Sequence, residues 1–219
     1  MPRPIAATIH MGALRHNLQR MREAANGRTL WAVVKANAYG HGLLRAARAF
    51  EAADGLAMID LCDAQKVREQ GWKKRILLLE GFFDATDIPL LEKYDIETIV
   101  HNRHMIELLK AQAPYASLKV HIKINSGMNR LGFLPQEEEE IRAQLQTIEG
   151  VQVMGVVTHF ANAEPTYGHE RPATVSIQLN RMDKIQPMPK NLCMANSAAT
   201  LWQSDVKGDA VRAGVAAAV

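Results

Sequence analysis

The feature that most constrains the fold of this chain is a regular alternation of short apolar runs with amphipathic stretches. Eight runs are predicted as strands: residues 30–35, 55–60, 75–80, 97–101, 118–125, 151–159, 191–196 and 210–215. The stretches between them space apolar residues three and four apart, as in Ile106, Leu109 and Ala113, which is typical of helices. Apolar strands joined through helices predict a parallel sheet that is covered on both faces.

Eight strand–helix units are the number that closes a barrel, so the predicted fold class is α/β, a (β/α)8 TIM barrel. A doubly wound open sheet is the alternative, but no GxGxxG pattern follows any strand. An extra segment comes first: a strand over 5–10 and a helix over 11–25. We expect this helix to cover the groove between the eighth and first strands. No linker rich in Pro, Gly or Ser divides the chain, which predicts one domain over residues 1–219.

The net charge and the cysteine content of the chain argue against several classes of partner and site. The net charge is +3 without a dense Lys/Arg block, so neither nucleic acid nor a membrane is an expected partner. Cys62 and Cys193 are far apart, which argues against a disulfide framework or a metal site. No apolar run approaches the ~20 residues of a membrane span, and the N-terminus lacks the apolar core of a signal peptide. These observations predict a soluble cytoplasmic protein.

Lys35 closes the first apolar run, and a turn that contains Tyr39 and several glycines follows it at once. A lysine at the end of a buried strand is poorly solvated, which disfavours the ammonium form and frees the amine as a nucleophile or base. The alternative is a lysine that leaves the strand end for solvent. In a βα barrel, residues at the carboxyl ends of strands bind ligands. The other polar residues at such ends are Lys123, Arg130, His159, Asn196, Ser197 and Arg212.

Taken singly, several of these residues have simpler explanations. His159 is more often a core histidine, Ser197 is more often a helix cap, and Gly214 is more often part of a bulge. All of these residues are expected at the same end of the barrel, which favours a ligand-binding site over the separate explanations. A helix N-terminus with glycine amides nearby binds phosphate. A phosphate seat close to a strand-end lysine suggests pyridoxal phosphate, whose aldehyde forms an imine with lysine.

Over essentially its whole length the chain resembles the N-terminal barrel domain of alanine racemases. The segment AVVKANAYGHG (32–42) is similar to the lysine signature of that family. Further similar segments are KINSGMNRLGF (123–133), THFANAE (158–164), ANSAATL (195–201) and VRAG (211–214). The resemblance implies pyridoxal 5'-phosphate as cofactor and alanine as the small-molecule substrate. The implied reaction interconverts L- and D-alanine and supplies cell-wall precursors.

The resemblance also implies roles for individual residues. Lys35 would hold the cofactor as a Schiff base and act as the base on one face of the substrate α-carbon. Tyr39, Ser197 and the backbone amides of Gly214 and Val215 would hold the phosphate.

A second group of residues would surround the ring. His159 would lie against the pyridine ring, and Asn196 belongs to the same cofactor-binding set. Arg212 would donate a hydrogen bond to the pyridine nitrogen. Because an arginine keeps its proton, that nitrogen would stay unprotonated and the ring would accept electrons less strongly. Arg130, the second expected catalytic residue, would contact the phenolic oxygen of the cofactor or the substrate carboxylate. Lys123 would be carbamylated and would orient that arginine.

The chain departs from the family pattern at its C-terminal end. The mostly β second domain of the family is absent, and with it the tyrosine that acts as second base across the dimer interface. Alanines stand at 210, 213 and 216–218. We therefore expect a truncated, engineered and monomeric barrel with weakened or lost racemisation, since losing one of two bases costs about 10²–10⁴-fold. The alternatives are a non-catalytic cofactor carrier and a structural scaffold. None of the tyrosines is placed to replace the base: Tyr39, Tyr94, Tyr115 and Tyr167.

Overall fold

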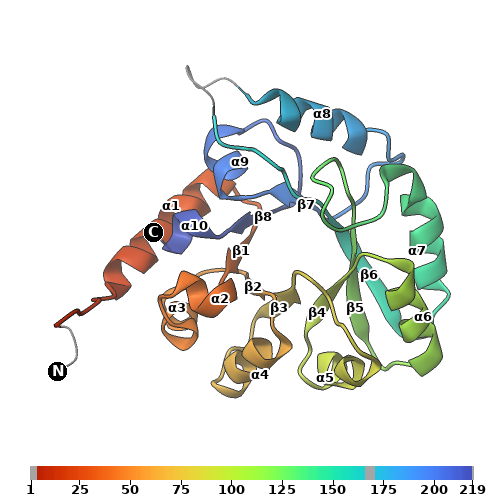
Figure 1. Ribbon diagram of the computed structural model, residues 1–219, viewed down its shortest axis with the longest axis horizontal. Helices are drawn as coiled ribbons and strands as arrows, with labels where there is room; N and C mark the ends of the chain where they lie inside the picture. Colours follow the sequence, from red (N-terminus) through yellow and green to blue (C-terminus); the bar gives the residue numbers. More distant parts are fainter. Residues whose placement is uncertain (1–3, 166–170, 219) are drawn as a thin grey trace.

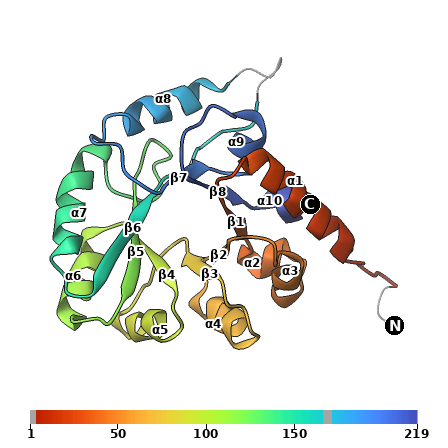
Figure 2. The ribbon, with the colours of Figure 1, turned by 180° about the vertical axis from the view of Figure 1, so that it is seen from behind.

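A closed barrel of eight parallel strands forms the centre of the computed structural model, which describes residues 4–165 and 171–218 (Figures 1 and 2). The strands follow one another around the ring in sequence order, and β8 pairs with β1. They are β1 (Thr29–Val33), β2 (Gly55–Met58), β3 (Arg75–Leu78), β4 (Glu97–Val100), β5 (Leu118–Lys123), β6 (Val151–Val157), β7 (Leu192–Ala195) and β8 (Ala210–Ala213). The predicted fold class is confirmed, and each strand ends one or two residues before its predicted end.

Helices surround the barrel as an outer layer (Figure 1). Each buries an apolar stripe against the sheet, as α6 does with Met105, Ile106 and Leu109. The helices are α1 (Met11–Ala25), α2 (Lys35–Tyr39), α3 (Leu43–Ala49), α4 (Leu61–Glu69), α5 (Ile88–Lys93), α6 (Arg103–Gln112), α7 (Glu138–Gln146), α8 (Ala173–Met182), α9 (Ser197–Trp202) and α10 (Val215–Ala218). Two single 3-10 turns precede α5 and α7: η1 (Ala85–Asp87) and η2 (Pro135–Glu137).

Helix α1 lies where the sequence predicts it, against β8 and β1, and it also contacts the short helix α10. Leu14, Leu18 and Met21 are almost fully buried on the inner face of this helix. The predicted strand over residues 5–10 is wrong, because residues 4–10 are irregular and mostly exposed. A closed ring offers no free strand edge to which such a segment could pair.

The alanine-rich end of the chain still completes the barrel. Ala210–Ala213 pair with both neighbouring strands, and Arg212 lies opposite Trp31 of β1. Val215, which was expected to end this strand, instead begins α10. Among the described residues no helix is both long and apolar enough to span a lipid bilayer.

Candidate functional site

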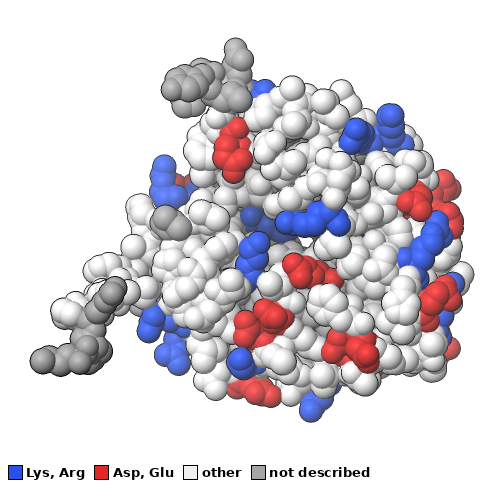
Figure 3. Space-filling model, viewed as in Figure 1, with Lys and Arg blue, Asp and Glu red and all other residues white. Residues whose placement is uncertain are grey.

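A cavity of about 330 Å³ opens at the carboxyl ends of the strands. Figure 3 shows Lys and Arg side chains around a hollow near the middle of this face, which Figure 1 views in ribbon form. All ten residues that the sequence predicted for the site line this one cavity. They are Lys35, Tyr39, Lys123, Arg130, His159, Asn196, Ser197, Arg212, Gly214 and Val215.

Lys35 and Tyr39 reach the cavity from an unusual turn directly after β1. Ala36, Asn37 and Ala38 have φ values of 52–54° and Tyr39 has φ 54°, so four consecutive residues adopt the left-handed conformation. The turn is held by the Asn37 side chain, whose Oδ1 accepts from the Leu43 amide at 2.8 Å. A left-handed conformation costs a non-glycine residue on the order of 1 kcal/mol. Backbone strain is therefore concentrated between the lysine and the tyrosine that share the cavity.

Ser197 and Gly214 bring two loops together at the wall of the cavity. The Ser197 hydroxyl accepts from the Gly214 amide at 2.9 Å and from the Ala216 amide at 3.4 Å. Asn196 caps α9, since its side chain accepts from the Ala199 amide at 2.9 Å. Gly214 has no room for a side chain, because an added Cβ would collide with the Tyr39 hydroxyl. The result is a cradle of amides and hydroxyls that suits a small anion.

Arg212 is buried at the floor of the cavity, with a relative exposure of 4%. Its Nη1 donates to the Cys193 carbonyl at 2.9 Å and to the Cys193 Sγ at 3.0 Å. Its Nη2 donates to the Thr158 carbonyl at 2.6 Å and points at His159 Nδ1, 3.1 Å away. His159 Nδ1 therefore accepts, which places the imidazole proton on Nε2.

Burial and positive charge shift two pKa values at this site. Burial, with the nearby charges of Arg212 and Arg130, lowers the pKa of Lys123 to about 7. Burial, followed by the charges of Arg212, Lys123, Arg130 and Lys35, lowers the pKa of His159 to about 2. At neutral pH the imidazole is neutral and a large fraction of the Lys123 amine is neutral too.

The sequence reasoning missed residues that line or support the cavity. Glu80 and Glu164 place carboxylates in its wall, and Glu80 ends the third predicted strand, so the strand-end rule could have found it. Gln178 of α8 is buried beneath the loops. Its amide donates to Ser126 Oγ and to the His159 carbonyl, both at 2.9 Å, and accepts from the Ala161 amide at 2.9 Å. The available signal was a polar residue on the apolar face of a predicted helix.

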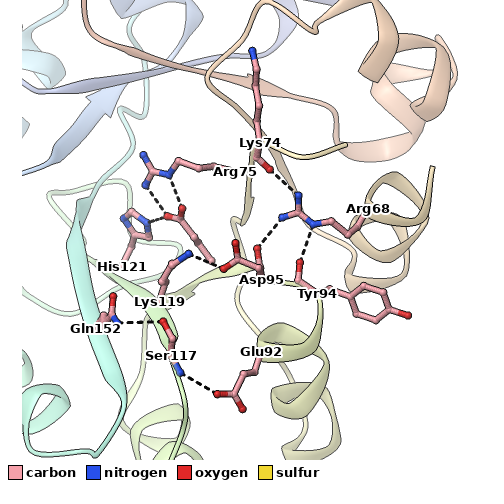
Figure 4. A network of polar contacts seen from close by, with 11 residues as sticks. Arg68, Lys74, Arg75, Glu92, Tyr94, Asp95, Ser117, Lys119, His121 and Gln152 are labelled. Carbon is pink, nitrogen blue, oxygen red and sulfur yellow. Dashed lines mark hydrogen bonds and ion pairs between the residues drawn. The ribbon is translucent and has the colours of Figure 1, made fainter. Parts of the chain in front are cut away.

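The opposite end of the barrel carries a different kind of polar network (Figure 4). The Glu97 carboxylate is buried and accepts from Arg75 at 2.5 and 2.7 Å, while His121 Nε2 lies 2.7 Å away. Burial alone would raise the pKa of Glu97, but the hydrogen bonds from Arg75 and His121 lower it to about 2. The Glu97 carboxylate is thus paired within the cluster, while His121 Nδ1 is buried without a hydrogen-bond partner among the described residues. A buried ion pair at this end of a barrel is typical of a stabilising role.

Two of the tyrosines also lie at that end, because Tyr94 and Tyr115 precede β4 and β5. The hydroxyl of Tyr94 donates to Glu69, and that of Tyr115 donates to the Leu109 carbonyl. Neither can reach the cavity, as the sequence predicted. Tyr167 and Val219 lie outside the described residues. Among those that are described, no group of three or more His, Cys, Asp or Glu side chains could hold a metal ion.

Comparisons with known proteins agree on one family. The family described as alanine racemase, N-terminal domain, matches residues 9–218. The catabolic alanine racemase of Klebsiella aerogenes is 45% identical over 215 residues, which are 98% of this chain and 59% of that protein. The alanine racemase of Janthinobacterium sp. (strain Marseille) is 44% identical, with 98% of this chain and 60% of that protein covered.

Comparison with solved structures identifies the same family. The biosynthetic alanine racemase from Pseudomonas aeruginosa superimposes with a TM-score of 0.87 at 33% identity, over 94% of this chain and 57% of that one. The alanine racemase from E. faecalis gives 0.86 at 32% identity, over 95% of this chain and 58% of that one. The chain thus spans about 59% of the length of the curated relatives that it matches.

Proposed function

Because the chain belongs to the family of alanine racemase N-terminal domains, we propose that its cavity binds pyridoxal 5'-phosphate through the Lys35 amine. One observation carries the proposal: the amine-bearing side chain and the Ser197–Gly214 cradle line the same cavity. A primary amine and an anion seat are the two groups that an aldehyde phosphate requires. The cavity volume of about 330 Å³ is within the range of about 300–1,000 Å³ for small-molecule sites.

The residues present fit this cofactor. Because Gly214 has no side chain, the Tyr39 hydroxyl occupies the space beside its backbone. Tyr39, Ser197 and the amides at the start of α10 would hold the phosphate, and Asn196 would fix the start of α9 beside it. His159 would lie against the ring as a neutral imidazole. Its lowered pKa supports this assignment, because a neutral ring stacks without adding another charge.

When bound, pyridoxal phosphate supplies an electron-accepting ring that acidifies the α-hydrogen of an attached amino acid. Lys35 would remove or return a proton at the α-carbon on one face. Arg212 would donate from Nε to the pyridine nitrogen, since both of its Nη atoms already donate to protein acceptors. A guanidinium keeps its proton, which favours proton return over transamination. Arg130 would contact the phenolic oxygen or the carboxylate of the amino acid.

The substrate that we propose is alanine, and the reaction of the longer protein of this type is interconversion of its two enantiomers. This chain supplies Lys35, the proposed base on one face of the α-carbon. Slow exchange of the α-hydrogen by Lys35 alone is therefore the activity that we propose for the chain itself, and a homodimer would apply to the longer protein.

The test is covalent labelling of Lys35. Protein is mixed with pyridoxal phosphate, reduced with borohydride and digested, and the peptides are weighed by mass spectrometry. We expect a pyridoxyl adduct on Lys35 and none in Lys35→Ala, with Lys66→Ala of α4 as the control that keeps the label. An unchanged absorption band in Lys35→Ala would falsify the proposal. Exchange of deuterium into D- and L-alanine then distinguishes an enzyme from a cofactor carrier.

A further inference from the structure

Arg212 has more donors than most buried sites can satisfy, because a guanidinium carries five N–H groups and no acceptor. Its two Nη atoms together carry four of them. Nη1 uses both of its hydrogens on one residue, the carbonyl at 2.9 Å and the thiol at 3.0 Å of Cys193. An orphaned N–H on a buried cation costs more than an orphaned neutral group. Cys193 therefore supplies two of the four contacts of this guanidinium, one from its backbone carbonyl and one from its thiol.

The position of Cys193 depends on an irregularity in β7. Cys193 pairs with Ala210 and Ala195 pairs with Val211, so Met194 is an extra residue in the ladder. Such bulges re-aim side chains and are frequent beside functional sites. Cys193 is only 3% exposed and belongs to the buried cluster in the barrel interior that includes Trp31, Leu77 and Val157. In this apolar layer it is a polar partner placed directly below Arg212.

We propose that Cys193 is the positioning residue that fixes Arg212 at the floor of the cavity, with its sulfur as a required hydrogen-bond acceptor. The consequence for the pyridine nitrogen rests on the proposed function. With the thiol removed, Nη1 keeps the Cys193 carbonyl and one of its N–H groups is left without an acceptor. We expect the guanidinium to shift toward a new acceptor, which would turn Nε and weaken the contact of Nη2 with His159.

The first test needs no cofactor, because His159 reports on Arg212. The imidazole signals of His159 are followed by NMR during an acid titration of the ligand-free protein. In Cys193→Ala we expect His159 to begin to titrate at a pH about one unit higher than in the parent, since the guanidinium charge has moved away. Cys193→Ser, which keeps an acceptor, should restore the parent titration.

A matched control separates positioning from packing. Val157→Ala removes apolar volume from the same interior layer, next to Cys193 in the β6–β7 pair, without removing an acceptor. It should leave the His159 titration unchanged while it lowers the melting temperature. The proposal is overturned if Val157→Ala shifts His159 as much as Cys193→Ala does, or if Cys193→Ser folds but titrates like the alanine variant.

The second test uses pyridoxal phosphate itself. We expect Cys193→Ala to bind it about tenfold more weakly, as one lost charge-assisted hydrogen bond implies, with a shifted absorption maximum that Cys193→Ser restores. Cys62→Ala, at the exposed cysteine of α4, should change neither quantity. If the parent protein takes up no pyridoxal phosphate, the proposed function fails, and the His159 titration still decides the role of Cys193. An unshifted titration in Cys193→Ala overturns that role.

Discussion

At the scale of single residues, the cavity depends on one position where a side chain would displace its neighbour. Gly214 lies between β8 and α10, and an added Cβ there would collide with the Tyr39 hydroxyl, so the tyrosine would have to move. Its amide meanwhile donates to Ser197. The residue thus joins three chain segments that are far apart in the sequence.

Gly214→Ala should therefore weaken binding of pyridoxal phosphate. The new methyl group must displace the Tyr39 ring from the cradle, and we expect at least about a tenfold loss of affinity, or about 1.4 kcal/mol. Fluorescence titration measures it. Gly12→Ala in α1, where an added Cβ meets nothing within 4 Å, is the control and should bind as the parent does. Equal affinities for the two variants would contradict the cradle.

Lys123 offers a second prediction at this scale. Its pKa of about 7 leaves the amine mostly neutral at pH 8, and a neutral amine adds carbon dioxide to give a carbamate. Arg130 and Arg212, whose charges lower that pKa, would stabilise the new negative charge. Protein held in ¹³C-bicarbonate should show a carbamate resonance that Lys123→Met lacks. The idea fails if the parent protein shows no such signal at pH 8, with Lys66→Ala as the control that retains it.

At the scale of elements, helix α1 closes the groove that it was predicted to close. Leu18 is 2% exposed and lies on the buried face of this helix. Leu18→Ala should lower the free energy of unfolding by about 3 kcal/mol, through lost burial and the cavity left behind. Urea unfolding followed by circular dichroism measures this loss, and Gln19→Ala on the exposed side of the helix is the control. A loss no larger than that of Gln19→Ala would show that the helix is not packed as described.

The elements were predictable where burial dictates them. All eight strands are apolar runs, and the polar residues that follow them converge because parallel strands end at the same rim. The left-handed turn over residues 36–39 was not predictable, since alanine has no preference for positive φ and only tertiary contacts impose it. For Gln178 the sequence offers only a polar residue on an apolar helix face, and its partners could not be predicted because they come from two other loops. The contact between Cys193 and Arg212 depends on a bulge that leaves no pattern in the sequence.

At the scale of the whole molecule, one end of the barrel carries the candidate binding site, and the other carries a polar network that stabilises the fold. One end presents Lys and Arg side chains around a cavity, and the other buries Glu97 between Arg75 and His121. This division predicts how the fold responds to acid. A carboxyl group whose pKa falls on folding stabilises the fold above its unfolded pKa, and that contribution is lost as the pH falls through the folded pKa.

For Glu97 the pKa falls from 4.5 to about 2, so about 3 kcal/mol of stability should be lost between roughly pH 5 and pH 2. Urea unfolding at a series of pH values measures this loss. Glu97→Gln should be less stable than the parent at pH 6 but should lose less on acidification. Glu107→Gln, at an exposed carboxylate of α6, is the control and should follow the parent curve. Parallel curves for Glu97→Gln and the parent would contradict the assignment.

The pairing of β8 with both β7 and β1 has a consequence for how copies of this chain can meet. Every strand of the ring pairs with a neighbouring strand on both sides, so none presents a free edge as a template for a strand of another molecule. Amyloid-like stacking requires such a template. Fibril growth from the folded chain must therefore wait until the ring has opened between two of its strands.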